Sequence, residues 1–389
     1  MANPPENGAD NSGTLIRKVE AWAIGSSIAD MDVGGGVPVT VVMHSVVVRV
    51  TTDDGAYGVG DSWVQETDAR ILLAGIRYGL APLLLGDDSR TVNRLWEKMW
   101  RVARNHGLHP ALSAIDIALW DLLGRRTGLS VSQLLGGPLR PEVEVYSTLP
   151  WRKPKEELAE MIRAAQKRGF RGAKVAVGHG VDDDRETIAY LCSAVPGMQI
   201  AVDANGRYDS ADAIRVGSTC DEYGVRWFEE PVPYTDIHGL ATVRSAIRTP
   251  VSGFQFDTSI YSMRKHLQVD ALTVYQPSLD KCGGITQAHK MATLADAWGR
   301  RLVPHSFAPA LSFAASLHIA GIAPTGGLTE FPVPEKAPSD FGRFVFGEHL
   351  VDLAPFAVDE HSHVRVPTGP GLGVDIDFDK VRDLEVATD

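Results

Sequence analysis

The sequence predicts an α/β protein in which a (β/α) barrel follows a smaller α+β domain. At 389 residues the chain is too long for one ordinary core, whereas a barrel takes roughly 200 to 250 residues. From about Pro141, short β-branched runs alternate with amphipathic helical segments. In that region polar residues recur every 23 to 29 positions, each where an apolar run ends. These residues are Lys174, Asp203, Glu229, Gln255, Ser278, His305 and Glu330.

This spacing matches one strand, one helix and two short loops, which form the repeating unit of a (β/α) barrel. Parallel strands place their C-terminal ends on the same rim, so residues far apart in sequence meet there. We therefore expect a barrel over residues 141–346, with the polar ring as its active site.

Residues 14–140 are expected to form the α+β domain. Two strand-like runs, 41–51 and 56–60, flank the turn sequence Asp53-Asp54-Gly55, which predicts a hairpin. Over 109–126, the apolar residues trace one helical face. This helix should have Pro110 in its first turn and end near Gly128.

Both ends of the chain differ in composition from the rest. Residues 1–13 are polar and rich in Pro, Gly and Asn, so we expect them to be disordered and without signal-peptide character. Residues 347–389 are rich in Gly and Pro and contain no clear barrel unit, so we expect this segment to return to the first domain.

Composition excludes several classes of protein. A hydrophobic fraction of 44% and a charged fraction of 22% are those of a soluble globular enzyme. The net charge of −11 argues against nucleic-acid binding, and no apolar run reaches membrane-spanning length. The three cysteines are odd in number and have no CxxC spacing, so neither a disulfide framework nor a zinc site is expected. A reducing cytoplasm fits best.

Two neighbouring strand ends carry the oxygen ligands that magnesium prefers. Asp203 and Asn205 are two residues apart at one strand end and therefore point to the same side. Glu229 and Glu230 end the next strand, which Pro231 stops. One carboxylate from each strand suits Mg²⁺, which takes few protein ligands and leaves positions for substrate oxygens.

The chain also resembles a known family. The motifs AKVAVG, VDANGRY, WFEEPVP, PVSGFQF, QPSLDKCGGIT, VPHSF and TEFP follow SAIDIALWDLLGR in this order. Their order and spacing resemble the mandelate racemase and muconate lactonizing enzyme branch of the enolase superfamily. The resemblance covers nearly the whole chain and implies an enolase-type barrel with an N-terminal capping domain, in a homo-oligomer. It further implies a magnesium enzyme that removes the proton α to a carboxylate and holds the resulting enediolate on the metal.

On this resemblance, Asp203 and Glu229 match the first two metal ligands, and Asn205 matches a nearby polar position that we expect to contact substrate. Gln255 stands at the third ligand position, which is usually Glu. An amide oxygen is still a hard ligand, but the site loses one negative charge, so we expect weaker metal retention. Asp257 could substitute if the strand end is bulged.

Lys174 matches the first lysine of the family's Lys-x-Lys motif, whose implied role is to hold the substrate carboxylate or tune its neighbour. Ala176 replaces the second lysine and cannot move a proton. A base on this face is therefore absent unless a loop residue such as His179 or Arg152 reaches in; for His179 we favour a solvent-facing role.

On the opposite face, His305 matches the catalytic histidine, but its usual carboxylate partner is replaced by Ser278. A serine could keep the orientation of the imidazole while losing the electrostatic support. Asp280, two residues later, is a candidate stand-in. Glu330 matches an acid that, when protonated, hydrogen-bonds the substrate carboxylate.

A single base narrows the reaction. Racemisation by direct proton transfer is served best by bases on both faces of the α-carbon, whereas syn-dehydration of a sugar acid needs one histidine. We therefore expect an acid-sugar dehydratase acting on a small carboxylate substrate. Two alternatives stay open: a racemase or epimerase, and a catalytically silent carboxylate-binding protein, since Ala176, Gln255 and Ser278 each remove a charge. The loop 25–38 has the glycines of a mobile lid. Its two acids, Asp30 and Asp32, are either binding groups for substrate hydroxyls or an amine, or part of a solvated loop.

Overall fold

The computed structural model describes residues 13–31, 39–65, 68–149, 152–307, 309–331 and 350–386. Residues 1–12 of the segment expected to be disordered lie outside these ranges, as does Asp32 of the expected lid. The expectation of a loop was wrong for residues 25–31, which form the end of the strand Ile16–Met31 because they pair with the next strand. The side chain of Asp30 is outside the description.

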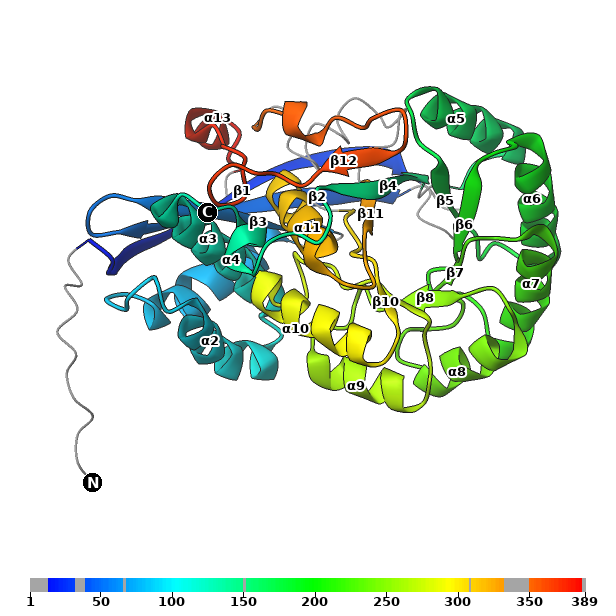
Figure 1. Cartoon of the computed structure of the whole chain (residues 1–389), viewed down its shortest axis with the longest axis horizontal. Coiled ribbons are helices and arrows are strands. Elements are labelled where there is room, and N and C mark those ends of the chain that lie inside the picture. Colours follow the sequence, from blue (N-terminus) through cyan, green and yellow to red (C-terminus); the bar gives the residue numbers. More distant parts are fainter. Residues whose placement is uncertain are drawn as a thin grey trace.

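The N-terminal part is an antiparallel sheet backed by helices (Figure 1). The strand order is β1-β2-β3, and the predicted hairpin is confirmed: Thr51 pairs with Tyr57 across a turn in which Gly55 has a φ of 87°. The elements are β1 (Ile16–Met31), β2 (Val39–Thr52), β3 (Tyr57–Gln65), α1 (Ala69–Ala74), η1 (Gly75–Leu80), η2 (Ala81–Leu83), α2 (Val92–His106), α3 (His109–Thr127) and α4 (Val131–Leu134).

Helix α3 ends where the sequence predicts, because Gly128 adopts the left-handed conformation at its C-cap with a φ of 70°. The expectation of a single apolar face was wrong. Ser113, Asp116 and Asp121 are buried together with the apolar positions. The reason is the position of α3, which packs against β3 on one side and against the barrel helix α10 (Gly284–Ala297) on another.

The second part is a curled, parallel sheet surrounded by helices (Figure 1). The sheet order is β10-β9-β8-β7-β6-β5-β4-β11, and each neighbouring pair in this series runs parallel. The strands are β4 (Glu142–Leu149), β5 (Gly172–Ala176), β6 (Gln199–Asp203), β7 (Phe228–Glu229), β8 (Val251–Gly253), β9 (Val274–Tyr275), β10 (Arg301–Leu302) and β11 (Leu328–Phe331). The further helices are α5 (Lys155–Lys167), α6 (Val181–Ala194), α7 (Ser210–Tyr223), α8 (Ile237–Ala246), α9 (Ile260–Gln268) and α11 (Ala310–Ile322).

The two edges of this sheet approach each other. The backbone N–H of Glu330 in β11 donates to the carbonyl oxygen of Pro304, just after β10, at 3.4 Å. The strands therefore curl into a (β/α) barrel, as the sequence predicts, and their C-terminal ends share one rim.

The C-terminal segment contacts both parts of the molecule. Strand β12 (His363–Arg365) pairs antiparallel with β4, and α13 (Phe378–Asp383) packs on β1. A further 3₁₀ turn, η4, spans Ala354–Phe356. The proposed domain division at residues 140 and 346 remains a prediction.

Buried polar contacts join the N-terminal sheet and helices to the barrel rim. Asp116 of α3 accepts hydrogen bonds from the backbone N–H and the hydroxyl of Thr286, at 2.9 and 2.7 Å. Gly284 has a φ of 78°, and a Cβ at this position would lie 2.5 Å from Asp116 Oδ2, so the approach requires glycine. Ser62 of β3 donates to the carbonyl oxygen of Asp280 at 2.8 Å. The N-terminal part thus fixes the loop that follows β9.

Among the described residues, no helix is both long and apolar enough to cross a membrane. Cys192, Cys220 and Cys282 are free thiols, so none of the three cysteines forms a disulfide.

Candidate functional site

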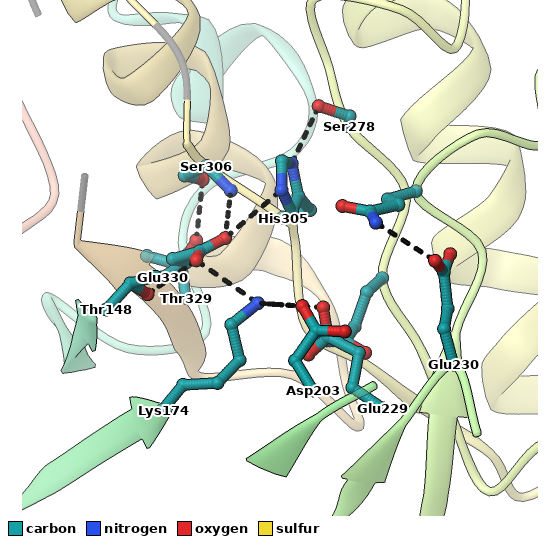
Figure 2. Close-up of polar contacts among 12 residues, drawn as sticks. Thr148, Lys174, Asp203, Glu229, Glu230, Ser278, His305, Ser306, Thr329 and Glu330 are labelled. Atoms are coloured by element: carbon teal, nitrogen blue, oxygen red, sulfur yellow. Dashed lines mark hydrogen bonds and ion pairs between the residues drawn. The ribbon is translucent and has the colours of Figure 1, made fainter. Parts of the chain in front are cut away.

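The polar ring gathers at the rim of the barrel. Asp203 and Glu229 are the last residues of β6 and β7, and they pair directly in the parallel register. Figure 2 shows these two carboxylates close to Lys174, with His305 and Glu330 on the other side of the lysine. The spacing in the sequence therefore does bring these five residues together.

Lys174 is the centre of this cluster. Its Nζ lies 2.7 Å from Glu229 Oε1, 3.2 Å from Glu330 Oε1 and 3.5 Å from Asp203 Oδ2 (Figure 2). Burial alone would lower the pKa of Lys174, but the surrounding carboxylates outweigh it and raise the pKa well above its usual value. The lysine is therefore a buried ammonium group.

The charges of the cluster do not balance. Three carboxyl groups surround one ammonium group in a buried site, so acidic groups outnumber the one basic group there. Burial raises the pKa of Glu229, and the neighbouring carboxylates add to this shift while Lys174 opposes it. Next to it, Oε1 of Glu230 is buried and has no hydrogen-bond partner among the described residues. An excess of hard, negatively charged oxygens of this kind fits a divalent cation such as Mg²⁺.

The third expected ligand, Gln255, is held by Glu230. Its Nε2 donates to Glu230 Oε2 at 3.1 Å, which directs the carbonyl oxygen of the same amide to the opposite side. Asp257 is engaged elsewhere: it accepts from the Ser262 hydroxyl and lies 3.5 Å from Nε2 of His266, and both partners belong to α9. Within the described ranges, no three Asp, Glu, His or Cys side chains form a metal-holding group.

His305 is buried and makes two polar contacts. Its Nδ1 lies 3.0 Å from the hydroxyl of Ser278, and its Nε2 lies 3.5 Å from Glu330 Oε2 (Figure 2). Burial lowers the pKa of His305 to about 3, although Glu330 opposes the shift. The imidazole is therefore neutral near pH 7, as a proton acceptor must be.

Asp280, the candidate stand-in for the missing carboxylate, does not bond to the imidazole directly. Its Oδ1 accepts from the hydroxyl of Ser278, which in turn contacts His305. The carboxylate thus stands one hydrogen bond further from the imidazole than in a direct pair.

Glu330 is held by several donors. It accepts from the hydroxyl of Thr148 and, at 3.1 Å, from the backbone N–H of Ser306 (Figure 2). Burial alone would raise the pKa of Glu330, but Lys174 and the other donors lower it to about 2. The group is therefore ionised near pH 7, which differs from the protonated acid that the resemblance implies.

The face opposite His305 offers no base among the residues expected there. Ala176 pairs with Asp203 in the sheet and supplies no ionisable group. His179 is half-buried, rather than solvent-facing, and its backbone N–H donates to Asp184 at 2.9 Å. Arg152 is exposed. In the described structure, neither of these two side chains hydrogen-bonds to the carboxylate cluster.

Asn205 stands at the edge of the site. It is exposed, has a φ of 48°, and donates its backbone N–H to Asp203 Oδ1 at 2.9 Å. The bond orients that carboxylate, and a substrate contact by the Asn205 side chain remains a prediction.

Two residues that orient Glu229 were missed at the level of sequence. Gln276 and the indole of Trp227 both donate to Glu229 Oε2, at 2.7 and 3.2 Å. The signal for Gln276 was its place directly after β9, two residues before Ser278. Because these two bonds hold Oε2 of Glu229, its other oxygen, Oε1, faces Lys174 and accepts from it.

Comparisons with known proteins agree with this architecture. Residues 157–381 match the family model described as enolase C-terminal domain-like. Residues 37–136 match the N-terminal domain of mandelate racemase and muconate lactonizing enzyme.

Named relatives cover most of the chain. A D-galactarolactone cycloisomerase of Agrobacterium fabrum is 30% identical over 358 residues, which is 88% of this chain and 91% of that protein. An arabinonate dehydratase of Saccharolobus solfataricus is 28% identical, over 86% of this chain and 88% of that protein. The crystal structure of a racemase from Streptomyces coelicolor with bound magnesium has a TM-score of 0.85 and 25% identity, over 96% of this chain and 100% of that one.

Fold, site and relatives together define a barrel enzyme whose site is built from carboxylates, a lysine and a histidine. The chain belongs to the mandelate racemase and muconate lactonizing enzyme branch of the enolase superfamily.

Proposed function

We propose that this protein is an acid-sugar dehydratase that removes water from a sugar acid with His305 as its single base and acid. The observation that carries the proposal is the asymmetry of the site. A neutral, buried imidazole stands on one side, and Ala176 supplies nothing on the other. The dehydratases among the relatives support the same substrate class.

The proposed metal ligands are Asp203, Glu229 and Gln255, which would hold Mg²⁺. When bound, this ion supplies positive charge that stabilises the negative charge developing on the substrate carboxylate. Lys174 is the proposed partner of that carboxylate as well; its buried ammonium group faces the same cluster as the proposed ligands Asp203 and Glu229.

The proposed reaction moves one proton through His305. Nε2 takes the proton from the α-carbon, and the C–H electron pair forms the enediolate of the substrate. The same proton then goes to the β-hydroxyl as its C–O bond breaks, so water leaves and an enol remains. The enol becomes a 2-keto-3-deoxy acid.

Product analysis in heavy water tests the proposal. The protein is incubated with magnesium and a panel of aldonic acids, aldaric acids and their lactones, and the products are followed by proton NMR. Formation of 2-keto-3-deoxy acids is the expected result. Deuterium incorporation at the α-carbon with inversion of its configuration would show that the reaction is epimerisation and not dehydration. An unchanged panel, with no magnesium binding by calorimetry, would favour a silent carboxylate-binding protein.

Isomerisation is the second candidate, because the cycloisomerase from Agrobacterium fabrum is 30% identical to this chain. Lactones in the substrate panel address it directly: conversion of a lactone faster than of the corresponding open acid would favour this candidate. A homo-oligomer in a reducing cytoplasm stays a prediction.

The plot of kcat/KM against pH should show no fall on the acid side that is caused by protonation of His305. Its pKa is lowered to about 3, so the neutral form persists above that value and is lost only as the pH falls through it. We expect kcat/KM to stay within about twofold between about pH 5 and pH 8 as far as this group is concerned. Steady-state rates across that range, with enzyme stability checked in parallel, provide the measurement. A limb with an apparent pKa near the ordinary histidine value would contradict the described burial.

Replacing Gln255 by Glu should tighten magnesium binding. A third carboxylate adds one negative charge, and we expect roughly a tenfold gain in affinity, or about 1.4 kcal/mol. The same change removes the amide donor to Glu230, so the variant should be less stable than the wild type in the presence of EDTA. Calorimetry measures the first effect and urea unfolding the second.

Asn serves as the matched control at the same position, since Gln255→Asn shortens the side chain without adding charge. Unchanged affinity in Gln255→Glu would remove residue 255 from the proposed ligand set.

A further inference from the structure

We propose that Asp280 is a positioning residue for the reaction: through the hydroxyl group of Ser278, it holds His305 in the tautomer whose Nε2 accepts the substrate proton. The inference rests on the proposed function, in which His305 moves that proton. It replaces the direct histidine–carboxylate pair, which this chain cannot form because Ser278 occupies the carboxylate position.

The three side chains form a continuous, buried hydrogen-bond series. The hydroxyl of Ser278 donates to Oδ1 of Asp280 and lies 3.0 Å from Nδ1 of His305. Ser278 and Asp280 are fully buried, and His305 is 6% exposed. Water therefore does not compete for these bonds, and the low local dielectric strengthens them.

With Asp280 ionised, the count of protons fixes the direction of the hydrogen bonds in this series. A carboxylate only accepts, so the single hydroxyl proton of Ser278 goes to Asp280. The serine oxygen can then only accept from the imidazole, which places the ring proton on Nδ1. A neutral imidazole has one such proton, so Nε2 keeps its lone pair.

Nε2 points toward the rest of the cluster. Figure 2 shows His305 between Ser278 and Glu330, with the ring nitrogen opposite the serine facing Glu330. The distance from Nε2 to Glu330 Oε2 is 3.5 Å, too long to require a proton between them. The lone pair of Nε2 is thus presented on the side of the site that Lys174 also faces.

The backbone holds the series in place. Ser278 and His305 form a parallel bridge, in which the N–H of His305 donates to the carbonyl of Pro277 at 3.2 Å. The carbonyl of Ser278 accepts from Lys281 and Cys282, at 3.0 and 2.8 Å, so a tight turn fixes the serine and the aspartate together. Because the backbone of Ser278 is held by the bridge to His305 and by the following turn, its side chain can set the orientation of the imidazole.

The direction of the two hydrogen bonds from His305 to Ser278 and from Ser278 to Asp280 depends on Asp280 being ionised. Burial raises the pKa of Asp280, while the charge of Lys281 and the Ser278 hydroxyl oppose that shift. A protonated Asp280 would reverse both hydrogen bonds and place the ring proton on Nε2. The tautomer of His305 therefore distinguishes the two directions in which the hydrogen bonds can run.

The test reads the tautomer directly. Nitrogen-15 spectra of the full-length protein labelled at histidine, with the His305 signals assigned by the His305→Asn variant, should show Nδ1 protonated. In Asp280→Asn, the amide can donate to Ser278, whose hydroxyl then turns to the imidazole, so the ring proton should move to Nε2. We expect kcat to fall roughly 10- to 100-fold with KM changed less than about twofold.

Four further variants, one of them a control, separate positioning from structure. Ser278→Ala should lose turnover to a similar extent, and the double variant Ser278→Ala with Asp280→Asn should lose no more than Ser278→Ala alone, because both act through one path. Ser278→Thr keeps a hydroxyl and should keep the Nδ1–H tautomer and most of the turnover. Asp221→Asn is the control, since Asp221 also accepts from a hydroxyl, that of Thr249 at 2.7 Å, and should change neither readout.

Two results would overturn the proposal. One is a wild-type His305 with its proton on Nε2. The other is an Asp280→Asn variant with the wild-type tautomer. Because the spectra need no turnover, a protein inactive on every sugar acid would refute the proposed function while leaving the tautomer measurement decisive for Asp280.

Discussion

Replacement of His305 by Asn is expected to lower kcat by about 10³-fold or more, with the fold and magnesium binding retained. The imidazole is the only neutral base that the described cluster presents to substrate, and Asn keeps a similar size without an acceptor nitrogen of comparable basicity. Turnover of the best substrate and the rate of α-deuterium exchange provide the measurements. Exchange should fall in parallel with turnover, because both begin with removal of the same proton.

His289→Asn is the matched control. His289 is a half-buried histidine on α10, and its pKa is lowered by burial as that of His305 is. It should retain wild-type turnover. If His305→Asn kept full activity, the assignment of the base would be wrong and the half-buried His179 would become the next residue to replace.

Replacement of Lys174 by Met is expected to destabilise the protein by about 3 to 5 kcal/mol in the absence of metal. The ammonium group is 4% exposed and contacts three carboxylates, which would be left buried without a compensating cation. Urea unfolding in EDTA measures the loss. The variant should also be inactive, since the substrate carboxylate would meet an uncompensated negative site.

Lys98→Met is the control for this change. Lys98 also pairs with a carboxylate, that of Asp87 at 2.7 Å, but its side chain is 43% exposed. Solvent screens such a pair, so its removal should cost far less. A loss in Lys174→Met no larger than in Lys98→Met would mean that the carboxyl groups of the cluster are protonated or hydrated and do not need the lysine as a compensating cation.

The sequence predicted the parts of the site that depend on periodicity. The regular spacing of strand ends brought Asp203 and Glu229 into register, and the same spacing placed His305 and Glu330 on the same rim. This works because strand direction and unit length determine which residues share an end of a parallel barrel.

Features that depend on three-dimensional packing could not be predicted as well from the sequence. The spacing suggested Asp280 as a partner for His305, but not that Ser278 would stand between them. The ionised state of Glu330 follows from the nearby Lys174 and from donors such as Ser306, which come from separate strands and loops. Likewise, α3 is buried all round because the barrel covers its outer side, which no local pattern encodes.

The junction between α3 and α10 limits how this enzyme can be re-engineered. Asp116 fits against Gly284, and the loop between β9 and α10 contains the Ser278–Asp280 pair. Grafting a foreign N-terminal module would therefore also disturb the loop that contacts the proposed base. A workable chimera has to carry residues 278–286 along with α3, as one exchangeable block.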